Sequence, residues 1–179
     1  STHNYFYNNN MNNFNNFNDF NNYNNTKKLN LLECFDFYHK PTFFTGDNSI
    51  YCNTCKCNTN AFYNTKIYSL PPILIITLNR GKGNAFNCDV DFPEELNLEN
   101  YVLNNLSLTK YSLIGVINHF GSSGMGGHFI SYCKHRIDKK WYCYNDAIVS
   151  LCTEPQNDYK KGTPYILFYA SIQGNKNVL

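Results

Sequence analysis

The chain has 179 residues, enough for one domain with a hydrophobic core, and it carries a formal net charge of only +2. Its lysines and arginines are scattered, which argues against a nucleic-acid-binding protein, and no apolar run is long enough to span a membrane. Eight cysteines without a secretory signal predict reduced thiols, and hence an intracellular protein of the cytoplasm or nucleus. Because the chain begins with Ser1 and not with methionine, we expect a piece of a longer protein.

Three regions follow one another along the chain. Residues 1–25 are dominated by Asn interleaved with Tyr and Phe, without a helical or strand period, which predicts a disordered low-complexity segment. Residues 26–171 carry periodic apolar patterns and form the predicted domain, and residues 172–179 are a polar tail. The 15 Tyr and 14 Phe favour strands over helices.

The domain begins with a predicted helix of about 12 residues, because Leu29, Leu32 and Phe35 recur at three- and four-residue spacing. Thr26 would cap this helix, and it would end before Pro41. Strands are predicted at 61–68, 73–78, 111–118, 129–134, 141–144, 148–151 and 165–169, with one helical turn within 153–161. The strand at 73–78 is predicted to be buried on both faces and the strand at 111–118 to be central, whereas the glycine-rich segments 81–87 and 119–127 are predicted loops. The pattern favours an α+β fold with a mostly antiparallel sheet.

The strands at 129–134 and 141–144 are joined by a charged turn and form a predicted antiparallel hairpin. The start of the first strand then lies beside the end of the second, so His128 should neighbour Asn145 and Asp146. An imidazole beside an amide or carboxylate is the base and its orienting group in nucleophilic catalysis. Neighbouring residues of a strand face opposite sides, so only one of the two can be the primary partner. Taken alone, His128 would be a surface histidine; the preceding Gly126 and Gly127 favour the catalytic interpretation.

These motifs resemble a known family. The box from Gly126 to Phe129, followed by the segment from Trp141 to Asp146, resembles the histidine box of the ubiquitin-specific proteases. Residues 69–80, 90–98, 111–119 and 164–169 resemble further family segments in the family's order. The ordered match runs from about residue 29 to about residue 170, and five matches in order are specific although each alone is weak.

The resemblance implies the papain-like cysteine protease fold, and specifically the C-terminal half of such a catalytic domain. It implies a deubiquitinating thiol protease that cuts after the C-terminal glycine of ubiquitin, with ubiquitin or ubiquitinated proteins as partners and no cofactor for catalysis. His128 would be the base, Asn145 would accept the ring N–H through Oδ1, and Asp146 would assist. Gly126 and Gly127 would let the backbone of the ubiquitin tail approach closely.

His119 is a weaker candidate, either for substrate contact or for positioning the 119–127 loop. The nucleophile is missing: Asn53-Thr54-Cys55 agrees with part of the family's cysteine box, but Cys52 precedes it and Lys56 follows. We therefore expect the nucleophilic cysteine to lie outside this chain. The alternative is a ubiquitin-binding or scaffold module that has lost catalysis.

Cys52 and Cys55 have the C-x-x-C spacing of two zinc ligands and resemble half of the family's zinc-binding fingers. A closed site needs four ligands, and upstream there is only Cys34. Although Cys57 or His39 could complete the set, their spacing gives no reason to expect it. We expect a remnant with free thiols and less than one tightly bound zinc per chain; a zinc-ribbon interaction domain is a weaker alternative.

Overall fold

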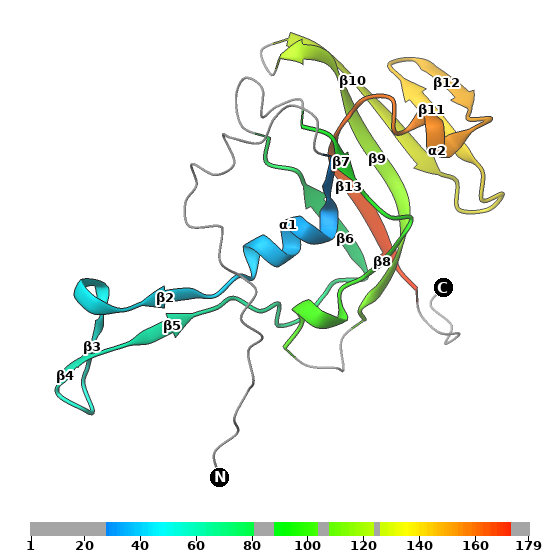
Figure 1. The fold of residues 1–179 in the computed structure, drawn as a ribbon. Coiled ribbons are helices and arrows are strands. Elements are labelled where there is room, and N and C mark those ends of the chain that lie inside the picture. The colour runs from blue at the N-terminus through cyan, green and yellow to red at the C-terminus, as the bar shows by residue number, and fades with distance from the viewer. Residues whose placement is uncertain (1–27, 81–87, 104–107, 124–125, 173–179) are drawn as a thin grey trace.

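The computed structural model describes residues 28–80, 88–103, 108–123 and 126–172. In these ranges a seven-stranded antiparallel sheet dominates the fold (Figure 1). Its strands run in the order β12-β11-β10-β9-β13-β6, and β8 pairs with β9. Their bounds are β6 Ile73–Thr77, β8 Glu95–Asn97, β9 Lys110–Ser123, β10 Gly126–Lys134, β11 Trp141–Asn145, β12 Ile148–Leu151 and β13 Thr163–Ser171. The predicted α+β class with a mostly antiparallel sheet is confirmed.

The remaining elements are short. The helices are α1, Leu31–Tyr38, and α2, Pro155–Asp158. Small two-stranded sheets pair β1 Leu29–Asn30 with β7 Val90–Asp91, β2 Thr42–Phe44 with β5 Ala61–Tyr63, and β3 Ile50–Cys52 with β4 Cys57–Thr59. Two 3-10 turns cover Gly46–Asn48 and Glu99–Tyr101. In the part of the chain that the structure describes, neither α-helix has the length and apolar character required to cross a membrane.

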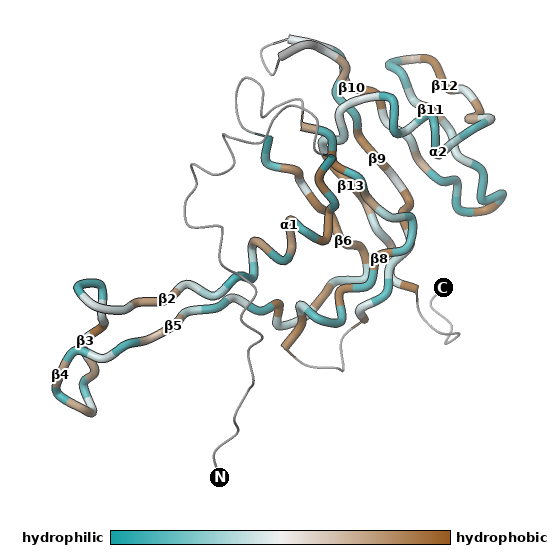
Figure 2. Tube along the Cα trace, in the orientation of Figure 1, coloured by the Kyte–Doolittle hydropathy of each residue, from teal (hydrophilic) through white to brown (hydrophobic). Residues whose placement is uncertain are grey.

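One face of the large sheet is buried and the other is open. Val116, Tyr132 and Trp141 share a face by strand alternation, and each is at most 6% exposed. They belong to one core with Leu31 of α1 and Tyr159, which follows α2. The opposite face carries apolar side chains that stay exposed, among them Ile75, Phe129, Tyr144 and Val149. Hydrophobic residues accordingly gather along β6, β9 and β13 (Figure 2).

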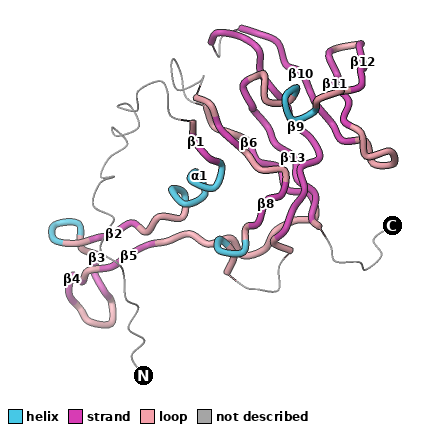
Figure 3. Tube along the Cα trace, turned by 45° about the vertical axis from the view of Figure 1, so that its right-hand side comes forward, coloured by secondary structure: helices cyan, strands magenta, loops and turns pink. Residues whose placement is uncertain are grey.

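An arm formed by the β2–β5 and β3–β4 pairs projects from the sheet, and both views show it standing away from the other strands (Figures 1 and 3). Phe43 and Phe62 face each other across β2 and β5 with ring centroids 6.1 Å apart, yet each is more than 60% exposed. At the base of the arm, His39 stacks on Phe35 and lies 5.1 Å from the ring of Tyr101. The arm is therefore anchored at its base and solvated along its length.

The predicted helix exists but begins later than expected. Asn30 caps α1, since its side chain accepts the N–H of Leu32 at 2.8 Å while Glu33 accepts the N–H of Asn30 at 2.9 Å. Leu29 instead belongs to β1 and pairs with Val90. The helix ends at Tyr38, before the proline at position 41, as predicted. The predicted cap at position 26 lies outside the described residues.

Two strand predictions and one loop prediction need correction. The strand predicted at 61–68 ends at Tyr63. β6 is not buried on both faces, because Ile75 is 57% exposed. Among the residues that the structure describes, it is an edge strand that pairs with β13 alone. The loop predicted at 119–127 is mostly strand, since β9 continues to Ser123 and β10 begins at Gly126. The loop predicted at 81–87 lies outside the described residues.

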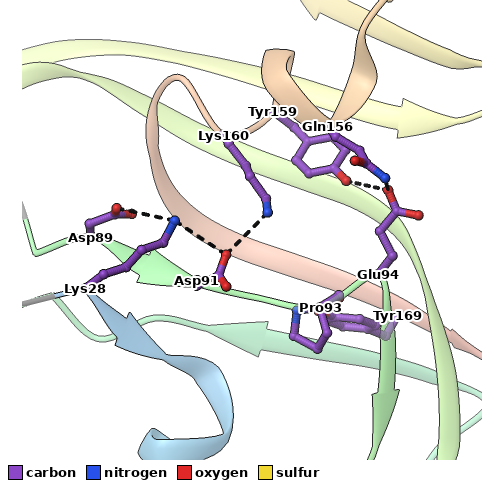
Figure 4. Close-up of polar contacts among 9 residues, drawn as sticks. All are labelled: Lys28, Asp89, Asp91, Pro93, Glu94, Gln156, Tyr159, Lys160 and Tyr169. Carbon is purple, nitrogen blue, oxygen red and sulfur yellow. Dashed lines mark hydrogen bonds and ion pairs between the residues drawn. The ribbon is translucent and has the colours of Figure 1, made fainter.

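Polar contacts join the start of the described chain to the segment around β7 and α2 (Figure 4). Lys28 lies 3.7 Å from Asp89 and 3.5 Å from Asp91, and Lys160 lies 3.3 Å from Asp91. Burial opposes ionisation of Asp91, but the hydrogen bonds and charges of Lys160 and Lys28 outweigh it and lower its pKa. These exposed pairs orient the segment and contribute little stability individually.

Candidate active site

The β10–β11 hairpin brings His128 and Asn145 together. Ser131 of β10 pairs with Tyr144 of β11, so the beginning of β10 runs alongside the end of β11. Both side chains lie on the same face of the sheet, and His128 Nε2 is 2.5 Å from Asn145 Oδ1. Because an amide oxygen only accepts, Nε2 carries the proton and donates it. In the neutral ring Nδ1 is then unprotonated and is the nitrogen able to accept a proton.

Asp146 lies in the turn after β11 and has a positive φ of 51°. Its Oδ2 is 3.9 Å from His128 Nε2, which is beyond hydrogen-bond distance but within ion-pair distance of a protonated ring. Its side chain is 82% exposed. The geometry makes Asn145 the direct hydrogen-bond partner of the ring and leaves Asp146 as a nearby charge.

The two glycines before His128 differ in their surroundings. The β9–β10 register shifts between Gly126 and His128, and Gly127 has a φ of +152°. A Cβ on Gly127 would collide with the His119 ring and would lie 2.6 Å from the carbonyl oxygen of Phe120, so only glycine fits there. A Cβ on Gly126 would meet nothing within 4 Å. Gly126 therefore borders open space that another chain could enter.

His119, the candidate for substrate contact or for loop positioning, is buried, with 4% of its surface exposed. It pairs with Phe129 across β9 and β10, and therefore lies on the face opposite His128. Burial favours the positioning alternative over direct contact. Sequence reasoning missed this packing, because the glycines around His119 indicated a loop.

An open hollow of about 320 Å³ lies next to this region and is lined partly by Phe120, the cross-strand partner of His128. Its charged lining residues are Asp89, Lys160 and Lys161. The hollow therefore presents side chains of both charges.

Among the described cysteines, four have a raised pKa and one has a lowered pKa. Burial is the main cause that raises the pKa of the thiols of Cys34, Cys88, Cys133 and Cys152, whereas a catalytic thiol needs a lowered pKa. Backbone N–H groups of Cys55 and Thr54 lower the pKa of Cys52. Cys52, however, ends β3 on the projecting arm (Figure 1), away from the β10–β11 hairpin.

The arm holds the candidate metal ligands. Cys52 lies opposite Cys57 in the β3–β4 pair, and Cys55 donates its backbone N–H to Cys52 Sγ at 3.5 Å. Among the residues that the structure describes, no group of three or more potential ligands is assembled. Cys52 and Cys55 alone do not fit a closed zinc site, which needs four ligands.

Comparison with known proteins identifies relatives of this arrangement. The family model described as ubiquitin carboxyl-terminal hydrolase matches residues 7–169. Human ubiquitin carboxyl-terminal hydrolase 15 is 32% identical over 148 residues, which cover 79% of this chain and 15% of that protein. Rat ubiquitin carboxyl-terminal hydrolase 4 is 35% identical over 146 residues, with 78% and 15% covered. The chain thus spans less than a fifth of the length of these relatives.

Solved structures agree in fold. The SAGA Ubp8/Sgf11/Sus1/Sgf73 DUB module bound to ubiquitin aldehyde contains a chain that matches with a TM-score of 0.67 and 28% identity. The match covers 84% of this chain and 35% of that chain. A SAGA DUB module bound to monoubiquitin matches with a TM-score of 0.68 and 29% identity, with 84% and 34% covered.

Proposed function

Because the chain belongs to the ubiquitin carboxyl-terminal hydrolase family, we propose that the protein containing it hydrolyses the peptide or isopeptide bond after the C-terminal glycine of ubiquitin. The chain corresponds to the C-terminal half of the papain-like catalytic domain. The observation that carries the proposal is the 2.5 Å contact between His128 Nε2 and Asn145 Oδ1. It supplies a base with a fixed tautomer, which thiol proteolysis requires.

In the proposed mechanism, Nδ1 of His128 accepts the proton of a cysteine thiol contributed from outside this chain. The thiolate attacks the carbonyl carbon of ubiquitin's last glycine, and the imidazolium then gives its proton to the departing amine. Water hydrolyses the resulting thioester with the same ring as base. Asn145 holds the ring throughout, and the Asp146 carboxylate, 3.9 Å away, stabilises the imidazolium.

The proposed partner is ubiquitin or a ubiquitinated protein. The open space at Gly126 and the exposure of Gly127 support close approach of an extended glycine tail. The solved relatives bound to ubiquitin add support. We further propose that residues 26–171 form the domain segment, with residues 1–25 and 172–179 flanking it. All eight cysteines are free, which suits the cytoplasm or nucleus.

The test uses the full-length protein and a ubiquitin substrate with a fluorescent leaving group. His128→Ala should lower kcat by about 10²- to 10⁴-fold, because it removes the general base, while ubiquitin binding stays close to normal. His135→Ala is the matched control, since His135 is a half-exposed histidine on the same hairpin that pairs with Asp138. It should keep kcat within about twofold, since its ring does not take part in proton transfer.

A ubiquitin probe with a thiol-reactive end identifies the nucleophile. We expect the adduct to map by mass spectrometry to a cysteine outside residues 1–179, and not to Cys55. Ubiquitin binding without turnover in the wild-type protein would favour the inactive binding module instead. Equal turnover of wild type and His128→Ala would refute the assigned role of His128.

A further inference from the structure

Gly127 and Phe129, the two residues that flank His128, both pack against the buried ring of His119. Gly127 lies so close to the His119 ring that a Cβ there would be 2.5 Å from His119 Cε1. Phe129 stacks edge-on against the same ring, with centroids 4.9 Å apart and an interplanar angle of 63°. His119 itself is 4% exposed. The backbone that carries His128 is therefore held on both sides by a single side chain from the neighbouring strand.

The contact extends across three strands on the face opposite His128. Phe129 of β10 also meets Tyr165 of β13, with centroids 5.5 Å apart and an angle of 73°. A second glycine admits the His119 ring, because a Cβ on Gly121 would lie 2.9 Å from its Cε1. The His119 ring thus occupies space that a side chain at Gly121 or Gly127 would fill, and Phe129 packs against the ring while Tyr165 supports Phe129.

We propose that His119 is a positioning residue that fixes the backbone at Gly127 and so aims the His128 ring at Asn145 and the nucleophile; this inference rests on the proposed function. Gly127 has a φ of +152° next to a register shift, and glycine has more backbone freedom than any other residue. Without the His119 ring beneath it, Gly127 could adopt other conformations. A hydrogen bond as short as that between His128 and Asn145 tolerates little displacement.

The test compares two buried histidines in the full-length protein. His119→Ala should lower kcat by about 10- to 100-fold, since displacements near 1 Å can cost that much, and should change KM by less than about threefold. The matched control is His39→Ala, because His39 is also buried among aromatic rings but lies at the base of the arm. It should keep kcat within about twofold despite a similar loss of melting temperature, because it does not support His128.

Two further measurements separate positioning from other roles. His119→Phe keeps a flat ring between the glycines and Phe129, and should recover most of the activity lost in His119→Ala. Free imidazole should partly restore His128→Ala but not His119→Ala, because only His128 exchanges protons. If His119→Ala matches His39→Ala in kcat, or if imidazole restores it, the positioning role is wrong. If His128→Ala is fully active, the proposed function itself fails.

Discussion

At the scale of single residues, the tautomer of His128 depends on an acceptor for its Nε2–H. Asn145 provides that acceptor at 2.5 Å, and the Asp146 carboxylate stands 3.9 Å from the same nitrogen. Asp146 is 82% exposed and sits in a turn, so its side chain is free to rotate toward the ring when Asn145 is shortened. We therefore propose that the two side chains act as one unit, with Asn145 as the primary partner of the ring and Asp146 as the reserve.

A mutant cycle tests this pairing in the full-length protein. Asn145→Ala should cost about tenfold in kcat/KM and less than His128→Ala, because Asp146 takes over the ring N–H. Asp146→Gly, which accepts the positive φ without strain, should be nearly neutral alone. The double variant should approach His128→Ala, so that the combined loss exceeds the product of the single losses. Simple multiplication of the single effects would show that Asp146 has no reserve role.

The proximity of His128 and Asn145 could be predicted from sequence because a hairpin fixes which strand ends meet. The separate geometry of Asp146 could not, since its positive φ is a property of the turn and aspartate tolerates both conformations. The burial of His119 was also not predictable from its neighbours. Glycines usually indicate a loop, whereas here they admit a ring between two strands.

At the scale of elements, local sequence patterns predicted which segments form strands. They did not predict the position of each strand in the sheet. Residues 73–77 are nearly all aliphatic, yet β6 is an edge strand whose outer residues are exposed. The position of β6 depends on its pairing with β13, which follows it in the sequence by almost ninety residues, as the Thr77–Ile166 register shows. The helix α1 begins later than its sequence pattern predicts for a similar reason, because Leu29 pairs with Val90 in the β1–β7 sheet.

The arm is the element for which we predict metal content. The full-length protein should hold less than one zinc at the arm, because Cys52 and Cys55 supply only two of about four ligands. Elemental analysis of wild type, Cys52→Ser and the helix control Cys34→Ser measures this. Equal zinc in all three proteins would agree with the expectation. A full equivalent that disappears in Cys52→Ser but persists in Cys34→Ser would contradict it and would require further ligands from another part of the protein.

At the scale of the whole molecule, elements from distant parts of the chain cover the buried face of the sheet. Glu94, just before β8, accepts the hydroxyl of Tyr159 at 2.7 Å and the side-chain amide of Gln156 at 2.9 Å (Figure 4). Tyr159 in turn packs on Trp141 with centroids 5.1 Å apart. Its backbone carbonyl accepts the side-chain amide of Asn118 at 2.7 Å. This cluster joins the segment before β8, the end of α2 and the strands that carry the candidate site.

Because Glu94 is a carboxylate, the stability of the contacts that join α2 to the sheet depends on pH. The hydrogen bond from Tyr159 is the main cause that lowers the pKa of Glu94, and the bond from Gln156 adds to it against the opposing effect of burial. A carboxyl group with a lowered folded-state pKa stabilises the fold above its unfolded pKa, about 4.3, and loses this contribution as pH falls through the folded value. Glu94→Gln keeps the shape of the side chain but cannot ionise.

Thermal melting of the full-length protein and of Glu94→Gln should therefore be compared near neutral pH and below about pH 4. The wild type should be the more stable protein near neutral pH, and its advantage should shrink on acidification because the protonated carboxyl is a weaker acceptor for Tyr159. Tyr159→Phe provides the control: it removes the donor, so adding Glu94→Gln to Tyr159→Phe should change the melting temperature much less than Glu94→Gln does alone. An advantage that stays constant with pH, or that grows as pH falls, would mean that ionised Glu94 does not hold α2 against the sheet.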